Sequence, residues 1–238
     1  MRREPFFVND FVHVYNRGNR KQEIVRDEHD CEYFLQALYY FNTTTLPANP
    51  FQELKKIGER DTLFNLKSYM WPTAWQQREP IVKIVAFILL KNHFHLLLQE
   101  IKEGGVSLFM KKFGIGMTNR FNTRYEETGK LFQGSYKARR VDSDNYLRYL
   151  FAYIQIKNAF EMYPGGAGLA VKNFDKGYDF AARYPYGSLT LNGNDGTSSI
   201  IDNEYFRDIF GDIGEYKAFA KNCLPFMGFN EKKCTLTF

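Results

Sequence analysis

The amino-acid sequence predicts an α+β fold built on a small antiparallel sheet. Strand-like and helix-like segments alternate between residue 11 and about residue 160, in the order β-α-β-β-α-β-α. The chain has 238 residues, of which 44% are hydrophobic and 17% aromatic, so it can bury a substantial core. This order of elements predicts a ferredoxin-like arrangement, with helices packed on one face of the sheet.

Four strands are expected where β-branched and aromatic residues gather between turn signals. Residues 11–16 (FVHVYN) form the first and end at a turn around Gly18. Residues 82–90 (VKIVAFILL) and 93–99 (HFHLLLQ) are separated by Lys91-Asn92 alone and predict a hairpin. A further strand is expected at residues 136–141.

Four helices are expected from apolar residues that recur along one helical face. They cover residues 27–41, 106–125, 145–160 and 202–223. Asp27 or Asp30 can cap the first of these helices, and Asp142 or Ser143 can cap the third.

The sequence also indicates how the chain is divided. We expect residues 1–168 to form one domain, with an insertion or long excursion at 43–80, where four of the eight prolines fall. Residues 169–238 are rich in Tyr, Gly and Asn up to the last helical stretch. We expect them to form a C-terminal helical and loop extension packed on the core.

Composition narrows the class of protein. The net charge of +5 and the pI of about 8.9 allow a local basic face, so nucleic acid is a candidate partner. Three cysteines without CxxC spacing indicate reduced thiols. No apolar run approaches the roughly 18 residues that cross a bilayer, and no apolar signal region follows the first residues. We therefore expect a cytoplasmic protein without membrane contact.

His93 and His95 are the first candidate functional residues. They lie two apart on an apolar strand, where both imidazoles point to the same face and Phe94 points into the core. Neutral imidazoles suit Mg, Mn, Zn or similar ions, and Mg or Mn is favoured where the chemistry concerns a phosphate. The alternative is that each histidine only makes hydrogen bonds in a partly buried sheet.

The helix after Ser143 carries the second candidate. Its core stripe consists of Leu147, Leu150, Phe151 and Ile154. Tyr153 lies about 90° from the centre of that stripe, on the flank that also holds Tyr146 and Tyr149. A phenol that loses its proton, helped by a metal or a nearby cation, can attack phosphorus. The alternative is that these phenols cover the edge of the sheet.

Basic residues follow the first strand, lie on the middle helix and precede the tyrosine helix. They are Arg17, Arg20, Lys111, Lys112, Arg120, Arg124, Lys137, Arg139 and Arg140. Aromatic residues are interleaved with them, a mixture that suits phosphate contact and base stacking on single-stranded or hairpin DNA. The alternative is an ordinary solvated surface.

Four segments resemble the single-tyrosine HUH transposases and, within them, the REP-associated tyrosine transposases. They are HVYNRGNRKQEIV, VAFILLKNHFHLLLQ, GKLFQGSYKARRVDSDNYLRYLFAYI, and YPYGS with SSIIDNEYFRDIFGD, in family order across most of the chain. The resemblance implies a ferredoxin-like core and a divalent metal, Mg or Mn, bound by His93 and His95. It also implies that Tyr153 attacks a DNA phosphate to give a 5′-phosphotyrosine link and a free 3′-OH.

The chain departs from the family pattern one helical turn after the tyrosine. Lys157 stands where the family usually has an Asn, Gln or His metal ligand. A protonated lysine cannot ligate a metal, but it can contact the scissile phosphate or lower the pKa of the phenol. Asn158 and Gln155 are the other candidate ligands, although they fall about 140° and about 160° round an α-helix from Tyr153.

The sequence therefore predicts a metal-dependent endonuclease and strand transferase that acts on hairpin or repeat DNA, with Tyr153 and Lys157 in catalysis. The resemblance is compatible with a monomer or a homodimer. Two alternatives stay open. One is a DNA- or RNA-hairpin-binding protein that has lost catalysis, which Lys157 favours. The other is a metal-dependent hydrolase that uses water.

Overall fold

A computed structural model describes residues 5–57, 69–192 and 198–227 of the chain. Its centre is an antiparallel sheet in the order β2-β3-β1-β4. The strands are β1 (Phe11–Arg17), β2 (Val82–Leu89), β3 (His93–Glu100) and β4 (Lys137–Arg140). All four lie where the sequence predicts them, and the α+β prediction with an antiparallel sheet is confirmed.

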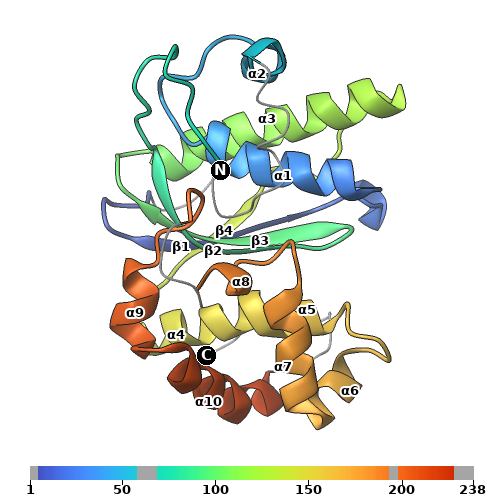
Figure 1. Cartoon of the computed structure of the whole chain (residues 1–238), viewed down its shortest axis with the longest axis vertical. Helices are drawn as coiled ribbons and strands as arrows, with labels where there is room; N and C mark the ends of the chain where they lie inside the picture. The colour runs from blue at the N-terminus through green and yellow to red at the C-terminus, as the bar shows by residue number, and fades with distance from the viewer. Residues whose placement is uncertain (1–4, 58–68, 193–197, 228–238) are drawn as a thin grey trace.

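Two long helices, α1 (Glu28–Tyr40) and α3 (Gly105–Tyr125), cover one face of this sheet (Figure 1). Buried rings join the helices to the strands: Phe113 meets Phe34 edge-on at 5.3 Å and Phe94 at 5.4 Å between ring centroids. The side chain of Asp27 caps α1 by accepting from the backbone N–H of Asp30. These contacts form the core that the apolar periodicity predicts.

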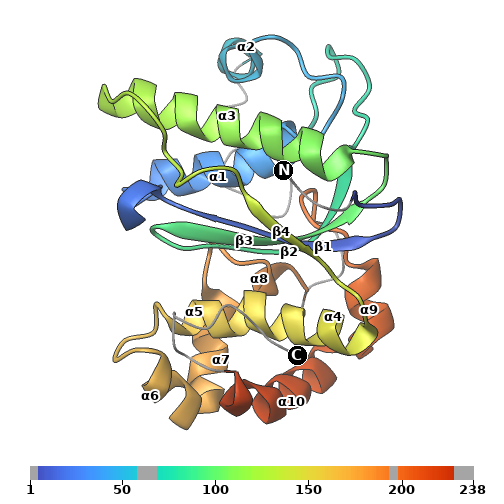
Figure 2. The same cartoon turned by 180° about the vertical axis from the view of Figure 1, so that it is seen from behind.

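The expectation that helices lie on one face only is wrong. The tyrosine helix, formed by α4 (Asp144–Ala152) and the π-helix η3 (Tyr153–Lys157), lies on the opposite face, and α5 (Asn158–Phe160) continues it (Figure 2). The physical reason is that strand β2 is apolar on both of its faces. Phe87 of β2 joins the core under α1 and α3, whereas Ile88 of β2 joins a second core with the tyrosine helix.

The tyrosine helix itself follows the predicted pattern up to Ala152. Its four stripe residues are all buried, and the Ser143 hydroxyl accepts from the backbone N–H of Tyr146 as the cap. The regular helix then changes. The N–H of Asn158 donates to the carbonyl of Tyr153, five residues back instead of four, which makes Tyr153–Lys157 a π turn.

The C-terminal helices surround the tyrosine helix on its side of the sheet (Figure 1). They are α6 (Ala167–Lys172), α7 (Phe174–Arg183), α8 (Leu189–Asn192), α9 (Glu204–Phe210) and α10 (Ile213–Cys223), followed by the 3-10 turn η4 (Leu224–Phe226). The single helix expected at 202–223 is wrong, because Gly211 adopts a φ of 69° and Asp212 caps a new helix. Residues 193–197 and 228–238 of the predicted extension, with Cys234, lie outside the described residues.

One part of this C-terminal region covers the edge of the sheet. The N–H of Leu89 donates to the carbonyl of Tyr186, and the N–H of Ser188 donates to the carbonyl of Phe87, both at 2.9 Å. Ser188 Oγ also accepts from the N–H of Phe87. The YPYGS segment thus pairs along β2, which removes an exposed strand edge.

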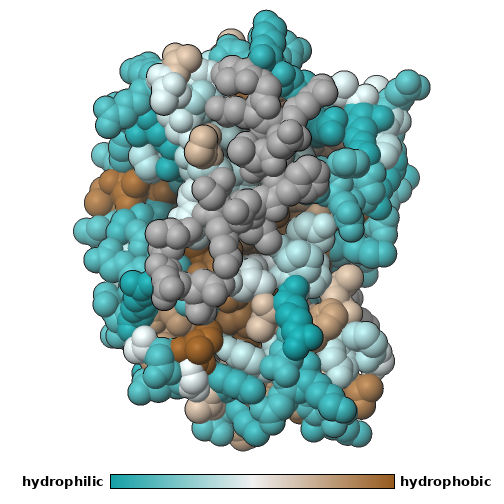
Figure 3. Space-filling model, viewed as in Figure 1, coloured by the Kyte–Doolittle hydropathy of each residue, from teal (hydrophilic) through white to brown (hydrophobic). Residues whose placement is uncertain are grey.

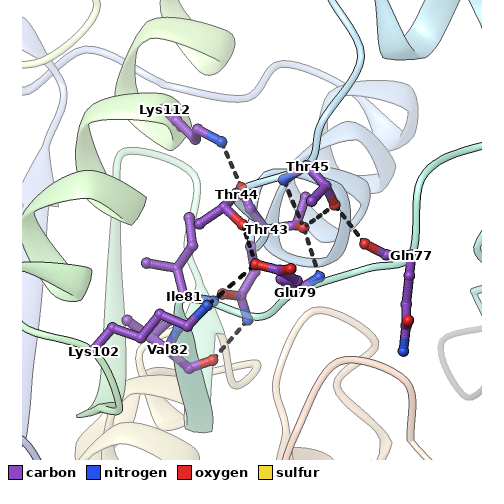
Figure 4. Close-up of polar contacts among 10 residues, drawn as sticks. Thr43, Thr44, Thr45, Gln77, Glu79, Ile81, Val82, Lys102 and Lys112 are labelled. Atoms are coloured by element: carbon purple, nitrogen blue, oxygen red, sulfur yellow. Dashed lines mark hydrogen bonds and ion pairs between the residues drawn. The ribbon is translucent and has the colours of Figure 1, made fainter.

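The excursion predicted at 43–80 returns to its starting point. Thr43 Oγ1 accepts from the N–H of Glu79, and the Thr45 hydroxyl donates to the carbonyl of Gln77, so the two ends lie side by side (Figure 4). Within it, α2 (Pro50–Ile57) and several aromatic residues pack against α1, whereas residues 58–68 lie outside the described part. The excursion therefore adds a layer over α1.

The molecular surface is mainly hydrophilic on the face seen in Figure 3, where hydrophobic residues form small separate groups. Within the described ranges, no helix has the length and apolar character needed to span a membrane. The buried hydrophobic residues form two cores, one between each helical layer and the sheet.

Asn42 joins the end of α1 to the start of β2 and provides a test of this packing. Its buried Oδ1 accepts from the N–H groups of Ile81 and Val82, both at 3.0 Å, and its Nδ2 donates to the carbonyl of Val82. Asn42→Ala leaves these backbone groups unpaired and should lower the free energy of unfolding by about 3 kcal/mol in urea titrations. Asn122→Ala, which removes one exposed bond to Gly129, should cost less than about 1 kcal/mol. Equal losses would refute the assigned role of Asn42.

Candidate active site

The candidate site lies on the face of the sheet that the tyrosine helix covers, which we call the site face. Along β3, Phe94, Leu96 and Leu98 belong to the core under α1 and α3, whereas Leu97 belongs to the core of the tyrosine helix. Alternation along the strand therefore directs His93 and His95 to the site face. Their ring centroids are 5.3 Å apart, with planes at 84°.

Tyr153 lies directly against these histidines. Its ring meets His95 edge-on at 5.5 Å between centroids and His13 of β1 edge-on at 6.0 Å. On its other side it stacks on Tyr149 at 6.1 Å, and Tyr149 stacks on Tyr146 at 6.2 Å. Of the three phenols that the sequence places on one flank, Tyr153 is therefore the one beside the histidine pair.

His95 is held by a third histidine. Its Nδ1 lies 2.9 Å from the Nε2 of His13, and the two rings are nearly parallel, with an angle of 21°. Burial, and then the nearby guanidinium of Arg139, lowers the pKa of His13 to about 3. Burial, followed by the charges of His13 and His93, places the pKa of His95 well below its ordinary value. Both imidazoles are neutral at physiological pH, the form that binds metals.

His93 is oriented by its neighbour in the chain. Its Nδ1 lies 2.7 Å from Oδ1 of Asn92, in the turn between β2 and β3. In His93 and His95 alike the Nδ1 atom makes a hydrogen bond, so we expect a metal to bind the Nε2 atoms. Metal-ligating histidines usually have their second ring nitrogen fixed in this way. The two residues fit a divalent metal as a pair of ligands.

A complete metal site needs more than this pair. Among the described residues, no group of three or more His, Cys, Asp or Glu side chains is arranged to hold a metal ion. From the described residues, a third ligand would therefore be an amide, a hydroxyl or a carbonyl group. Such oxygen donors suit Mg and Mn.

Lys157 occupies the position one α-helical turn after Tyr153. Its ammonium lies 5.1 Å from the centroid of the Tyr153 ring and 3.0 Å from Oε1 of Glu161. Only 8% of Lys157 is exposed, so its charge acts close to the phenol with limited screening by solvent. A protonated ammonium at this position cannot ligate a metal.

The π turn changes the position of Asn158. A regular helix would place it far round from Tyr153, but the π turn adds one residue, so Asn158 makes the backbone hydrogen bond that residue 157 would make. The 140° separation expected from α-helical geometry is therefore wrong. Asn158 is 1% exposed, and neither of its side-chain amide atoms has a hydrogen-bond partner within the described part of the chain. An unpaired buried amide of this kind is costly and marks a functional candidate.

Some of the predicted basic residues also lie on the site face. Lys137 and Arg139 of β4 pair in register with Tyr15 and His13, and Arg17 pairs with His93. The guanidinium of Arg139 lies 4.8 Å from the ring centroid of Tyr146. Arg20 is exposed in the turn η1 (Asn19–Lys21) that follows β1. These cations border the histidines and the row of tyrosines.

The other five predicted cations do not lie at the site. Lys111, Lys112, Arg120 and Arg124 lie on α3, across the sheet, and Arg140 alternates to the same side. Lys112 donates to the carbonyl of Thr43 (Figure 4), and Arg124 is bound to Asp27 and Asp30. Of the predicted basic residues, only Arg17, Arg20, Lys137 and Arg139 therefore lie near the site, because α3 packs on the opposite face of the sheet. A role of these residues in binding DNA stays a prediction.

His13 and Tyr15 are site residues that the sequence analysis did not single out. Tyr15 stacks on His95 at 5.5 Å between centroids, with planes at 24°, and the ring of His13 lies 5.2 Å from each of them. Period-2 alternation in FVHVYN already places both on one face, and the motif HVYNRGN begins with His13. The sequence alone does not predict that β1 pairs with β3, nor the register of that pairing.

The low pKa of His13 predicts how stability depends on pH. In the unfolded chain the imidazole takes up a proton below about pH 6.5, whereas the folded protein resists it until about pH 3, so stability falls as pH decreases through this window. At pH 5 this costs about 2 kcal/mol for one histidine. Between pH 7.5 and pH 5, in EDTA, His13→Gln should lose about 2 kcal/mol less than the wild type in urea titrations. Equal losses would contradict the neutral, buried imidazole.

Comparison of the chain with known proteins finds a similar solved structure and a matching family model. A solved structure described as "Structure of the REP associates tyrosine transposase bound to a REP hairpin" is similar over 81% of this chain and 83% of that chain, with 12% sequence identity and a TM-score of 0.44. No curated protein matches the chain. The family model "Transposase IS200 like" matches residues 59–157, a segment that contains His93, His95 and Tyr153. Over residues 59–157 the chain is thus similar to the IS200-like transposases.

Proposed function

We propose that this protein is a metal-dependent single-strand DNA endonuclease and strand transferase that uses Tyr153 as its nucleophile. The observation that carries the proposal is the contact of the Tyr153 ring with His95, at 5.5 Å between centroids, on the face that also holds His93. A nucleophile beside two imidazoles that can hold a divalent metal is an arrangement that supports phosphoryl transfer. A transposase acts on DNA by such transfers.

His93 and His95 would hold the metal, Mg or Mn, through their Nε2 atoms. Asn158 is the third ligand that the π turn makes available, through its buried amide oxygen. When bound, the metal polarises a phosphate oxygen and stabilises the charge that develops on it. The remaining chemistry belongs to side chains of the chain itself.

Tyr153 would attack the phosphorus atom of a DNA phosphodiester. Its phenol proton passes to solvent, its oxygen bonds to phosphorus, and the bond from phosphorus to the 3′ oxygen breaks. The 3′ oxygen takes a proton from solvent and becomes a free 3′-OH, while the 5′ side stays linked to Tyr153. The reverse attack by a 3′-OH joins strands. Lys157, 5.1 Å from the ring centroid, stabilises the phenolate during both steps.

Single-stranded or hairpin DNA fits the surroundings of this site. Arg17, Lys137 and Arg139 line the site face of β1 and β4, and Arg20 lies in the adjoining turn. Such cations contact phosphates, and the row of Tyr146 and Tyr149 beside them offers rings for base stacking. The domain limits at residue 168, a cytoplasmic location and a monomeric or homodimeric state remain parts of this proposal.

The nucleophile is tested by covalent trapping. Wild-type protein incubated with a single-stranded hairpin oligonucleotide and Mn should form an adduct that survives denaturing electrophoresis. Tyr153→Phe should reduce adduct formation at least about 1,000-fold, because no other group replaces the attacking oxygen. Tyr149→Phe is the matched control: it removes the phenol stacked on Tyr153 and should keep the adduct within about threefold of wild type.

Three outcomes of this experiment decide among functions. An adduct with Tyr153→Phe would refute the nucleophile. Cleavage without a protein linkage would indicate a hydrolase that uses water. Tight hairpin binding with neither adduct nor cleavage, under any divalent metal, would indicate a hairpin-binding protein, the alternative that Lys157 favours.

The third ligand is tested by metal affinity. Asn158→Ala should weaken Mn binding, followed by electron paramagnetic resonance, by about 10-fold or more, whereas Asn158→Asp, which keeps an oxygen at the same place, should not. Lys157→Ala should leave Mn affinity within about threefold, because its ammonium cannot ligate a metal. Because both amide atoms of Asn158 are buried and unpaired, Asn158→Ala should not lower the melting temperature markedly. Unchanged Mn affinity in Asn158→Ala would exclude it as a ligand.

A further inference from the structure

We propose that His13 is a positioning residue that holds His95 in the tautomer protonated on Nδ1. In that tautomer the Nε2 atom of His95 carries the lone pair that a metal needs. The inference rests on the proposed function in so far as His95 is a metal ligand. It concerns a residue outside the His-x-His motif and outside the matched family segment, which begins at residue 59.

The geometry leaves one short hydrogen bond between the two rings. Nε2 of His13 and Nδ1 of His95 are 2.9 Å apart, and both side chains are nearly inaccessible, with 6% and 5% of their surface exposed. The rings come from adjacent strands, where His13 pairs with Leu97 and Tyr15 pairs with His95, so the two histidines are diagonal neighbours. Strand register therefore fixes the distance.

A hydrogen bond between two nitrogens contains one proton, and its position decides what His95 can do. If Nδ1 of His95 donates to Nε2 of His13, the lone pair of His95 lies on Nε2. If His13 donates instead, the proton of neutral His95 is on its Nε2 atom, which then cannot bind a metal. Only the first arrangement is compatible with a metal at His95.

The surroundings of His95 make His13 the residue that performs this role. The ring of His95 lies against Tyr15 at 24° and meets Tyr153 edge-on, so those two contacts fix the plane of the ring. Ring contacts do not distinguish one tautomer from the other. The direction of the hydrogen bond to His13 does, because it decides which nitrogen of His95 is protonated. A carboxylate or a backbone carbonyl commonly takes this place in other metal sites.

The test uses the full chain without metal first. Long-range 15N–1H spectra should show His95 of the wild type protonated on Nδ1. His13→Gln keeps a hydrogen-bonding group near the position of Nε2 and should keep this tautomer, whereas His13→Leu, which fills space without an acceptor, should lose it. Tyr15→Phe is the matched control because it keeps the ring stacked on His95, and it should behave as wild type.

Metal affinity is the second measurement. Mn binding followed by electron paramagnetic resonance should weaken about 10- to 100-fold in His13→Leu and stay within about threefold of wild type in His13→Gln and Tyr15→Phe. Wild-type His95 protonated on Nε2, or His13→Leu with unchanged tautomer and Mn affinity, would overturn the inference. His13→Gln guards against misfolding as the cause of a loss.

The two proposals fail in different ways. If His95→Ala binds Mn as tightly as wild type, the metal site of the proposed function is wrong, and the tautomer spectra of the metal-free protein still decide the role of His13. If His95→Ala loses Mn but His13→Leu does not, the proposed metal site stands and the positioning role is refuted.

Discussion

The structure depends on one constraint: its sheet is covered by helices on both faces, so polar groups on either face must be satisfied within the protein. On the side of α1 and α3, the strands meet this constraint with apolar side chains such as Val12, Val14 and Phe94. On the site face, β1 and β3 instead place His13 and His95 under the tyrosine helix, and these two satisfy each other. A buried imidazole pair is tolerated because each ring is neutral and hydrogen bonded.

The same constraint explains how much of the fold the sequence predicts. The strand β3 is recognised easily because its period-2 pattern separates His93 and His95 from Phe94 and Leu96. The side on which the tyrosine helix packs is not predictable in this way, because β2 is buried on both faces and carries no alternation. The expectation of one helical layer failed for this reason. The same expectation wrongly placed α3, with its lysines and arginines, on the face of the sheet that carries the candidate site.

The site shows a second limit of prediction. Apolar spacing in the tyrosine helix correctly places Leu150, Phe151 and Tyr153, since each lies before the helix changes its hydrogen bonding. The π turn has no signature in that spacing, and a helical projection with constant rotation puts Asn158 in the wrong direction. Likewise, His13 becomes recognisable only once register places β1 beside β3. Local periodicity predicts faces, whereas tertiary pairing decides which faces meet.

The π turn allows both a lysine, Lys157, and a candidate metal ligand, Asn158, to follow Tyr153 by one helical turn. In an α-helix the residues three and four positions on lie on the same face as Tyr153, and Lys157 at the fourth position would replace a metal ligand. The extra residue of the π turn lets Lys157 keep its ammonium over the Tyr153 ring, while Asn158 makes the backbone hydrogen bond to Tyr153. The cost is an amide buried without a partner, a destabilising feature that folded proteins usually avoid. Functional sites often keep such a destabilising feature, and an amide oxygen that binds a metal ion would explain it here. The departure from the family pattern at Lys157 therefore does not by itself argue against catalysis.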